Sequence, residues 1–396
     1  MGILFPNGVN AFFLLAFSKE LKKMNKAYLI LADGTIFEGQ SIGKTGSVIG
    51  ETVFTTGMTG YLETLTDPSY YGQIVTQTFP LIGNYGVINE DFESKKSWVR
   101  GYIVREMCEK PSNFRCEGDL DSFLRQQEII GIKGIDTRKL TKILREAGVM
   151  NGMIVSGNET EKIETVLKSN SEKEKLLETI KAYIITEAVK TVSRSEAEDK
   201  EAENEKKAQK GHVVLWDFGA KENIKRELEK RGLKVTLVPY NTTADEIKKL
   251  APDGIMLSNG PGDPAENTGI IEEIRKLCEY GQIPIFGICL GHQMLALARG
   301  AKTSKLKYGH RGGNQPVKDL ETGRVYISSQ NHGYAVENDS LPSYAKLRFV
   351  NTNDQTCEGI EYTDIPAFSV QFHPEACSGP HDTNYLFDLF FKMMER

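Results

Sequence analysis

The 396-residue sequence lacks the features that mark secreted scaffolds, membrane proteins and nucleic-acid-binding proteins. Its six cysteines form neither a C-x-x-C pair nor a dense framework, which argues against a disulfide scaffold or a thiolate metal site. The longest apolar run, residues 11–17, is far shorter than the roughly 20 residues of a membrane span. Basic residues number 49 against 54 acidic ones, so neither nucleic acid nor a membrane is expected as a partner. We therefore expect a cytoplasmic protein.

With 39% hydrophobic and 26% charged residues, the composition is typical of a globular protein. The length of 396 residues allows two or three domains. Residues 193–210 are densely charged and contain nothing apolar larger than alanine, so they cannot bury enough surface to order themselves. We place a linker at residues 191–211, between domains at 24–190 and 212–396. Residues 1–23 precede a second methionine and a clean strand pattern, and we interpret them as a misplaced start or a disordered tail.

The two predicted domains differ in their periodicity. Residues 28–157 predict a small, β-rich α+β domain with helices near 119–127 and 136–147, and residues 160–190 add a further helical stretch. After the linker, strands alternate with helices, which predicts a doubly wound, mostly parallel α/β sheet. The predicted strands of this sheet are residues 212–218, 234–240, 254–259 and 283–288. Ligands of such sheets bind at the carboxyl ends of the strands, so we expect functional residues directly after each strand.

A nucleophile is predicted in the segment FGICLGHQ, residues 286–293. Cys289 lies between an apolar strand and a helix in the pattern G-x-C-x-G, the cysteine form of a nucleophile elbow. Its glycines permit the sharp turn that exposes the side chain. The start of the helix favours a thiolate, and the N–H of Leu290 is positioned to stabilise an oxyanion. Although most cysteines are inert core residues, this position favours a catalytic one.

A base is predicted in the segment QFHPEA, residues 371–376. Pro374 favours an extended backbone at His373, so His373 and Glu375 point to the same side of the chain. A carboxylate beside an imidazole fixes its tautomer and stabilises the imidazolium, as a catalytic triad requires. His-Pro-Glu alone is more often a surface turn, but a cysteine elbow in the same domain makes a triad the stronger interpretation.

A further glycine-rich segment, LSNGPGDP at residues 257–264, follows a predicted strand. Gly260 and Gly262 let the backbone approach a ligand closely, and their N–H groups could provide a second hydrogen-bond donor to an oxyanion. Residues 39–45, GQSIGKT, are one residue short of a P-loop and precede a strand pattern instead of a helix. We therefore predict no nucleotide site there.

Two segments rich in Gly, Asn and His, residues 307–314 and 328–336, are predicted as loops. Their histidines, His310 and His332, could act as ligands or bases, but the sequence favours structural or substrate-positioning roles. The histidine spacing fits no standard zinc pattern, so the sequence predicts no metal site.

The elbow, the His-Pro-Glu motif and NGPGDP together resemble the class I glutamine amidotransferases over residues 212–396. Residues 50–75 and 134–148 look like the amino-terminal domain of carbamoyl-phosphate synthetase small subunits. The segments TFPLIGNYG, WDFGAKENI, KYGHRGGNQPVKD and GPHD extend this resemblance over nearly the whole chain from Met24. The resemblance implies a flavodoxin-like C-terminal domain beside the smaller N-terminal one.

By this resemblance, Cys289 attacks L-glutamine to form a γ-glutamyl thioester, His373 transfers the protons and Glu375 orients His373. The resemblance also implies that ammonia passes through a tunnel to a large subunit in a heterodimer. That subunit uses ATP, Mg and bicarbonate to make carbamoyl phosphate for arginine and pyrimidine biosynthesis, and no cofactor is expected in this chain. The implied glutamine and oxyanion positions are Ser69, Gly260, Gly262, Leu290, Gln293, Asn331, Gly333 and Tyr334.

Two alternatives stay open. A catalytically silent regulatory or interaction subunit would keep the fold and depend on free ammonia, although the presence of Cys289 argues against it. A free-standing γ-glutamyl hydrolase would share the elbow but would leave the amino-terminal domain without a role.

Overall fold

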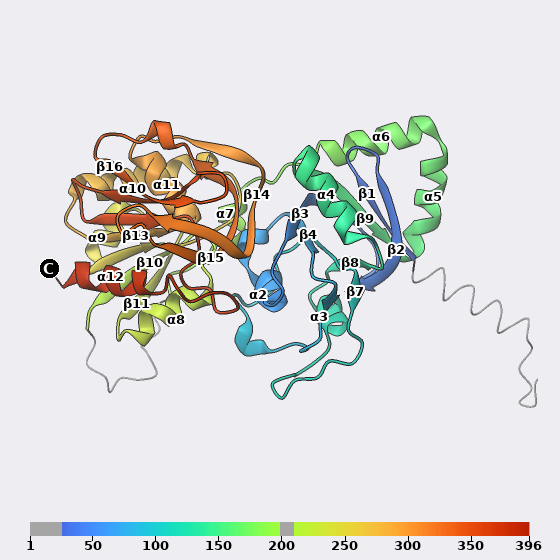
Figure 1. Ribbon diagram of the computed structural model, residues 1–396, viewed down its shortest axis with the longest axis horizontal. Helices are drawn as coiled ribbons and strands as arrows, with labels where there is room; N and C mark the ends of the chain where they lie inside the picture. Colours follow the sequence, from blue (N-terminus) through green and yellow to red (C-terminus); the bar gives the residue numbers. More distant parts are fainter. Residues whose placement is uncertain (1–25, 199–209, 396) are drawn as a thin grey trace, which may run out of the picture. The chain divides into compact units, whose positions relative to one another are not determined.

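The computed structural model describes residues 26–198 and 210–395, which form two compact units (Figure 1). The first unit contains the described residues up to Thr55 together with residues 72–90 and 99–184. The second contains residues 56–71, 91–98 and those from Ile185 onwards, so two short segments of the amino-terminal half belong to it. The predicted extension at 1–23 and most of the predicted linker (199–209) lie outside the described residues.

Seven strands of the first unit close into a barrel, in the order β1-β2-β8-β6-β4-β3-β9. Alternate residues of β1 enter different cores, because side chains alternate across a strand. Leu29 packs with residues of other barrel strands such as Ile74 and Ile154, whereas Ile30 packs against the helices that follow β9. The barrel strands are β1 (Lys26–Leu31), β2 (Ile36–Gly43), β3 (Ser47–Thr55), β4 (Gln73–Gln77), β6 (Gly101–Ile103), β8 (Ile130–Lys133) and β9 (Met150–Ser156).

Three helices of the first unit begin at a capping side chain. The predicted helices at 119–127 and 136–147 are confirmed as α3 (Leu120–Gln126) and α4 (Thr137–Ala147). The Asp136 side chain accepts the Lys139 N–H at 2.9 Å, and Gly148 ends α4 with φ 100°. The helical stretch predicted after residue 160 is divided into α5 (Thr160–Lys168) and α6 (Asn170–Lys181), because Ser169 caps a new helix.

Nine strands of the second unit form one sheet, in the order β11-β10-β12-β13-β18-β17-β16-β14-β15. The first five pair in parallel, and β11-β10-β12-β13 has the flavodoxin-type order that reverses beside β10. The last four add antiparallel strands. The predicted α/β class is therefore confirmed. The strands are β10 (His212–Asp217), β11 (Lys234–Pro239), β12 (Gly254–Leu257), β13 (Ile285–Ile288), β14 (Thr303–Asp319), β15 (Val325–Val336), β16 (Ala345–Asn351), β17 (Cys357–Tyr362) and β18 (Ala367–Val370).

Helices cover both faces of this sheet. Trp216 of β10 enters one core with residues of α9, α10 and α11, whereas its neighbour Leu215 enters another with residues of α8 and α12. Successive side chains of a buried parallel strand thus feed two cores, which explains why these strands are apolar throughout. The helices are α7 (Ala188–Val192), α8 (Glu222–Lys230), α9 (Ala244–Lys249), α10 (Thr268–Tyr280), α11 (Leu290–Ala298) and α12 (Tyr385–Met394).

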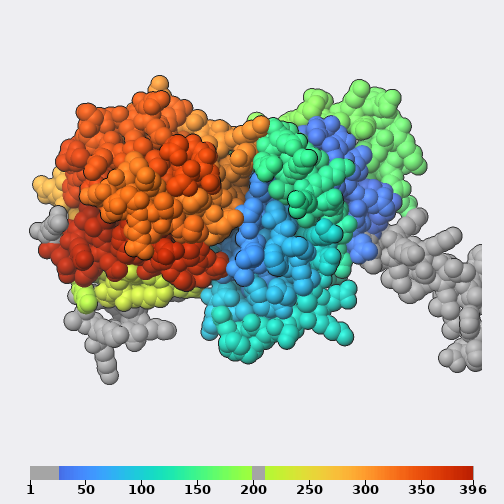
Figure 2. All heavy atoms as spheres, viewed as in Figure 1, coloured from blue at the N-terminus to red at the C-terminus, as the bar shows by residue number. Residues whose placement is uncertain are grey.

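The loops predicted at 307–314 and 328–336 are wrong, because both segments are strands of the β14–β15 hairpin. The register between them shifts twice, after Lys305 and after Gly312, and these irregularities accommodate the glycines that suggested loops. Buried polar side chains such as His310 and Asn331 are hydrogen-bonded within the fold, to Asp354 and Asp67, so polarity was a poor guide to loops. In the space-filling view the antiparallel strands, in orange, cover much of the visible face of the second unit (Figure 2).

No helix within residues 26–198 and 210–395 is both long and apolar enough to cross a membrane. The P-loop-like segment at 39–45 runs along β2 and is followed by β3, as its strand pattern predicts. Lys44 is exposed and pairs with Glu128 at 2.6 Å.

We expect the aromatic cluster around Phe286 to contribute strongly to stability. Phe286 is fully buried on β13 and stacks on Phe368 at 4.3 Å, with Phe387 and Phe390 at 5.8 Å. Replacing Phe286 with Ala should lower the free energy of unfolding by about 3–5 kcal/mol in urea titrations. Phe114→Ala is the control, because Phe114 is 96% exposed, and it should change the free energy of unfolding by less than about 0.5 kcal/mol. Equal effects of the two substitutions would contradict a stabilising role of the cluster.

Candidate active site

Cys289 occupies the turn between β13 and α11. Its backbone has φ 53° and ψ −103°, a strained conformation for a residue other than glycine. A Cβ on Gly287 would lie 2.9 Å from the backbone of Gly291, and a Cβ on Gly291 would lie 2.4 Å from the Leu257 carbonyl oxygen. Both glycines are therefore needed for α11 to start so close to β12 and β13. The turn has the strand–turn–helix form of the predicted elbow.

The surroundings of Cys289 favour a neutral thiol. The residue is 2% exposed, and its Sγ lies 3.6 Å from the Asn331 carbonyl oxygen. Burial raises the pKa of the thiol, and the carboxylates of Asp67 and Glu375 raise it further. Lys221 and the Leu290 N–H act in the opposite direction but do not outweigh burial. The start of α11 therefore lowers the pKa of the thiol, as predicted, but burial outweighs this effect, so a base must take the proton when the sulfur attacks.

His373 and Glu375 face each other, as the extended-chain argument predicts. The Nδ1–H of His373 donates to Glu375 Oε1 at 2.6 Å, and both side chains are buried. Burial alone would raise the pKa of Glu375, but His373 and Lys221 lower it to about 2, so the carboxylate stays charged. Among the described residues, His373 Nε2 has no hydrogen-bond partner, which leaves it free to receive a proton.

Lys221 is a buried cation that the sequence motifs did not reveal. It directly precedes α8, in the loop after β10, and its Nζ lies 3.4 Å from Glu375 Oε1 and 3.6 Å from Asp67 Oδ2. Burial opposes its charge, but Asp67, Glu375 and Glu93 together raise its pKa. The rule that functional residues follow the strands of a parallel sheet could have identified it.

Asp67 brings two of the predicted glutamine-binding residues together. Its Oδ1 accepts the Ser69 N–H at 2.9 Å, and its Oδ2 accepts from Asn331 Nδ2 at 3.1 Å. The Ser69 hydroxyl in turn accepts from Asn259 Nδ2 at 2.9 Å. Ser69 lies in the short helix η1 (Pro68–Tyr70) of the 56–71 segment. All four residues belong to the second unit, so this part of the candidate site is formed within that unit.

Two pairs of the other predicted binding residues are in contact: Gly260 with Leu290, and Gln293 with Tyr334. Gly260, after β12, packs against Leu290, because a Cβ on Gly260 would lie 2.8 Å from Leu290 Cδ2. Gln293 on α11 donates from Nε2 to the Tyr334 carbonyl oxygen at 2.7 Å and to Gln371 Oε1 at 2.8 Å. Gly333 precedes Tyr334 on β15, and Gly262, with φ 89°, lies against Ala188.

Glu93 connects the loop of the His-Pro-Glu motif to the start of α8. Its Oε2 accepts the Asn223 N–H at 3.1 Å, and the Asn223 side chain donates to the Glu375 carbonyl oxygen. The Glu93 N–H donates to the Thr66 hydroxyl at 2.9 Å. Burial raises the pKa of Glu93 to about 7, against the opposing effect of Lys221. No sequence motif marked this residue.

Comparison with known proteins gives matches in both halves of the chain. The class-I glutamine amidotransferase family model matches residues 214–393, and the carbamoyl-phosphate synthase small chain, CPSase domain, matches residues 29–154. A carbamoyl phosphate synthase small chain of Clostridium perfringens is 51% identical, covering 93% of this chain and 99% of the relative. Proteins of the same name from Listeria monocytogenes and Bacillus cereus are 50% identical, covering 94% and 93% of this chain and 97% and 96% of the relatives.

The close approach at the elbow predicts different outcomes for two glycines at the same position of their helices. Gly291 is the second residue of α11, and a methyl group there would collide with the Leu257 carbonyl. Gly269 is the second residue of α10, and a Cβ there meets nothing within 4 Å. Gly291→Ala should lower the free energy of unfolding by about 2 kcal/mol and slow alkylation of Cys289, whereas Gly269→Ala should be neutral within about 1 kcal/mol. If the two variants had equal free energies of unfolding in urea titrations, close packing of Gly291 against the Leu257 carbonyl would be contradicted.

The raised pKa of Glu93 predicts a pH-dependent stability. Between pH 4.5 and 7 the folded chain keeps a proton on Glu93 that the unfolded chain has released, so the free energy of unfolding falls as pH rises. Glu93→Gln should remove this contribution, on the order of 3 kcal/mol across the interval, in urea titrations at several pH values. Glu266→Gln, at an exposed carboxylate, is the control and should leave the slope unchanged. An unaltered slope in Glu93→Gln would contradict the assignment.

Proposed function

This chain belongs to the family of carbamoyl phosphate synthase small chains, the glutamine-hydrolysing subunits of carbamoyl-phosphate synthase, and on that premise we propose that Cys289, His373 and Glu375 are its catalytic triad. The observation that carries the proposal is the buried His373–Glu375 bond of 2.6 Å, with Nε2 of the same imidazole unpartnered among the described residues. Glu375 and Lys221 also lie within electrostatic reach of Cys289 at the strained elbow. A cysteine at a strained elbow and an oriented base with an unpartnered nitrogen are the two groups that thiol-dependent attack requires.

In the proposed reaction, His373 Nε2 takes the proton of the Cys289 thiol as the sulfur attacks the carboxamide carbon of L-glutamine. The N–H groups of Leu290 and Gly260 stabilise the tetrahedral oxyanion. The imidazolium then protonates the leaving nitrogen, ammonia departs, and a γ-glutamyl thioester remains on Cys289. His373 next activates water, which hydrolyses the thioester to glutamate and restores the thiol. Glu375 stays ionised throughout and stabilises the imidazolium.

The proposed glutamine site consists of residues that hydrogen bonds or close packing already hold in place. Asp67 holds Ser69 and Asn331, and the Tyr334 carbonyl holds the amide nitrogen of Gln293. A fixed site loses little entropy when substrate binds, which favours productive orientation of the carboxamide. The proposed contacts to glutamine and its oxyanion are Ser69, Gly260, Gly262, Leu290, Gln293, Asn331, Gly333 and Tyr334.

The ammonia released in this site is proposed to pass through an internal tunnel to a large subunit. That subunit would bind ATP and Mg and form carbamoyl phosphate from bicarbonate for arginine and pyrimidine biosynthesis, and we propose that the glutaminase chemistry of this chain uses no cofactor. Along the sequence we propose the division into domains at 24–190 and 212–396 with a linker at 191–211, although residues 56–71, 91–98 and 185–190 fold with the second unit. We propose the cytoplasm as the compartment. The family membership supports these proposals.

Release of ammonia and glutamate from L-glutamine tests the triad. Cys289→Ala should lower the rate at least about 1,000-fold, because no other group replaces the nucleophile. Cys278→Ala is the matched control, since Cys278 is also a buried cysteine but packs in a different core, and its rate should stay within about twofold. Each chain is assayed with and without the large subunit and ATP.

The outcomes separate the alternatives. Hydrolysis that requires Cys289 and rises with the large subunit and ATP supports the coupled amidotransferase. Hydrolysis unaffected by Cys289→Ala would reject the triad, and none in any combination would favour a silent subunit. Strong hydrolysis that is indifferent to the large subunit would favour a free-standing γ-glutamyl hydrolase.

A further inference from the structure

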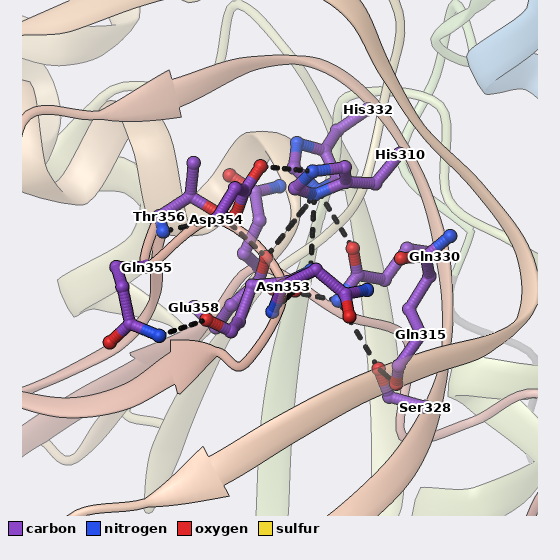
Figure 3. A network of polar contacts seen from close by, with 12 residues as sticks. His310, Gln315, Ser328, Gln330, His332, Asn353, Asp354, Gln355, Thr356 and Glu358 are labelled. Carbon is purple, nitrogen blue, oxygen red and sulfur yellow. Dashed lines mark hydrogen bonds and ion pairs between the residues drawn. The ribbon is translucent and has the colours of Figure 1, made fainter.

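Two histidines and a glutamate form a buried group in the antiparallel part of the large sheet (Figure 3). His310 of β14 is paired in register with His332 of β15, and Glu358 comes from β17. Their side chains are 9%, 2% and 0% exposed. One nitrogen or oxygen atom of each lies within 4.8 Å of those of the other two. None of these residues belongs to the proposed triad.

The distances from Glu358 Oε1 to the two histidine nitrogens suit a small cation. Glu358 Oε1 lies 3.4 Å from His310 Nδ1 and 3.9 Å from His332 Nε2. Two ligands of a tetrahedral zinc ion, each about 2.1 Å from the metal, are ~3.4 Å apart. The first pair is therefore already at the required separation, and the second needs a movement of about half an ångström.

The outer nitrogen of each imidazole is held by an oxygen acceptor. His310 Nε2 lies 2.8 Å from Asp354 Oδ2, and His332 Nδ1 lies 2.8 Å from the Tyr334 carbonyl oxygen. In protein metal sites, ligating histidines characteristically donate their second N–H to a carboxylate or a backbone carbonyl. These bonds fix the rings so that His310 Nδ1 and His332 Nε2 face Glu358. Asn351 Nδ2 also lies 3.5 Å from His310 Nδ1, so an ion would replace this contact.

The inner side of His332 is crowded with acceptors. His332 Nε2 lies 3.2 Å from Gln330 Oε1, while Gln330 Nε2 donates to Glu358 Oε2 at 2.9 Å. When His332 Nδ1 carries the proton, its Nε2 lone pair faces both the Gln330 oxygen and Glu358 Oε1. Glu358 Oε1 accepts from Thr356 Oγ1 at 3.4 Å, but no donor lies between His332 Nε2 and Gln330 Oε1 in this tautomer. Two buried acceptors facing each other are unfavourable, and a cation beside them removes the repulsion.

We propose that His310, His332 and Glu358 bind one divalent transition-metal ion of the zinc class, with the Gln330 amide oxygen or a water as fourth ligand. Imidazole and carboxylate ligands suit this class, and two histidines with one glutamate form a known ligand set for zinc. The half-exposed Asp354 gives the group its connection to the surface. The ligands come from three strands, which is why no spacing motif in the sequence predicts the site.

The ion would also fix the strand that carries Asn331, Gly333 and Tyr334. The Tyr334 carbonyl accepts from both His332 Nδ1 and Gln293 Nε2, so a ligated His332 would hold this carbonyl in place. This consequence for glutamine binding rests on the proposed function, whereas the binding of the ion does not.

Cobalt binding to the full-length chain tests the proposal. After treatment with a chelator, the chain should take up one Co²⁺ with the visible absorption of a tetrahedral ion and no thiolate charge-transfer band, and Zn²⁺ should displace it. At about a hundredfold excess of Zn²⁺ over its Kd, the Tm should rise by about 5 °C. Binding should weaken at least about 100-fold in His310→Gln and Glu358→Gln, and about 10- to 100-fold in Asp354→Asn. His212→Gln, at a histidine on β10 that bonds Thr236, is the control and should bind as the unaltered chain does.

The proposal can still be tested if a substitution of a buried ligand prevents folding. Asp354 is partly exposed and touches the metal site through His310 alone among the proposed ligands, so Asp354→Asn provides a readout independent of the buried ligands. Absence of stoichiometric Co²⁺ would overturn the proposal, as would binding that Glu358→Gln and Asp354→Asn leave unchanged. Cys289→Ala should bind Co²⁺ as the unaltered chain does, which separates this test from that of the triad.

Discussion

The candidate active site depends on the ion pairs that the buried ammonium group of Lys221 forms with Asp67 and Glu375. This ammonium group is buried beside the carboxylates of Asp67 and Glu375 and near Glu93, whose raised pKa of about 7 leaves it only partly charged at neutral pH. A buried charge without partners would be strongly destabilising. Asp67 and Glu93 come from residues 56–71 and 91–98, the two segments of the amino-terminal half that fold with the second unit. The need to neutralise one buried cation therefore gives a physical reason for segments distant in the sequence to meet here.

The same ammonium organises the chemistry. By keeping Glu375 charged, it preserves the acceptor that binds His373 Nδ1–H and so leaves Nε2 as the basic nitrogen. Cys289 is buried as a neutral thiol, so the proposed mechanism transfers a proton during the attack and does not depend on a standing thiolate. A buried, neutral thiol is also less exposed to oxidation and alkylation than a free thiolate would be.

The antiparallel strands give the sheet a second role. The parallel strands end at the elbow and at the NGPGDP loop, whereas β14, β15 and β17 support a polar network beside the proposed glutamine strand. His332 connects the two, because its Nδ1 bonds the carbonyl that also holds Gln293. Whatever occupies the His310–His332–Glu358 group thus acts on the position of β15.

Local chemistry in the sequence determined the parallel α/β pattern, the capped helices of the first unit, the strand–turn–helix at Cys289 and the facing of His373 and Glu375. Each of these follows from side-chain periodicity or from the backbone preferences of Gly and Pro over a few residues. The tertiary structure alone decided the positions of Lys221, Asp67 and Glu93, the neutral state of the thiol, and the strands where loops were expected. These depend on burial and on charges brought together from distant segments, and neither has a local signal in the chain.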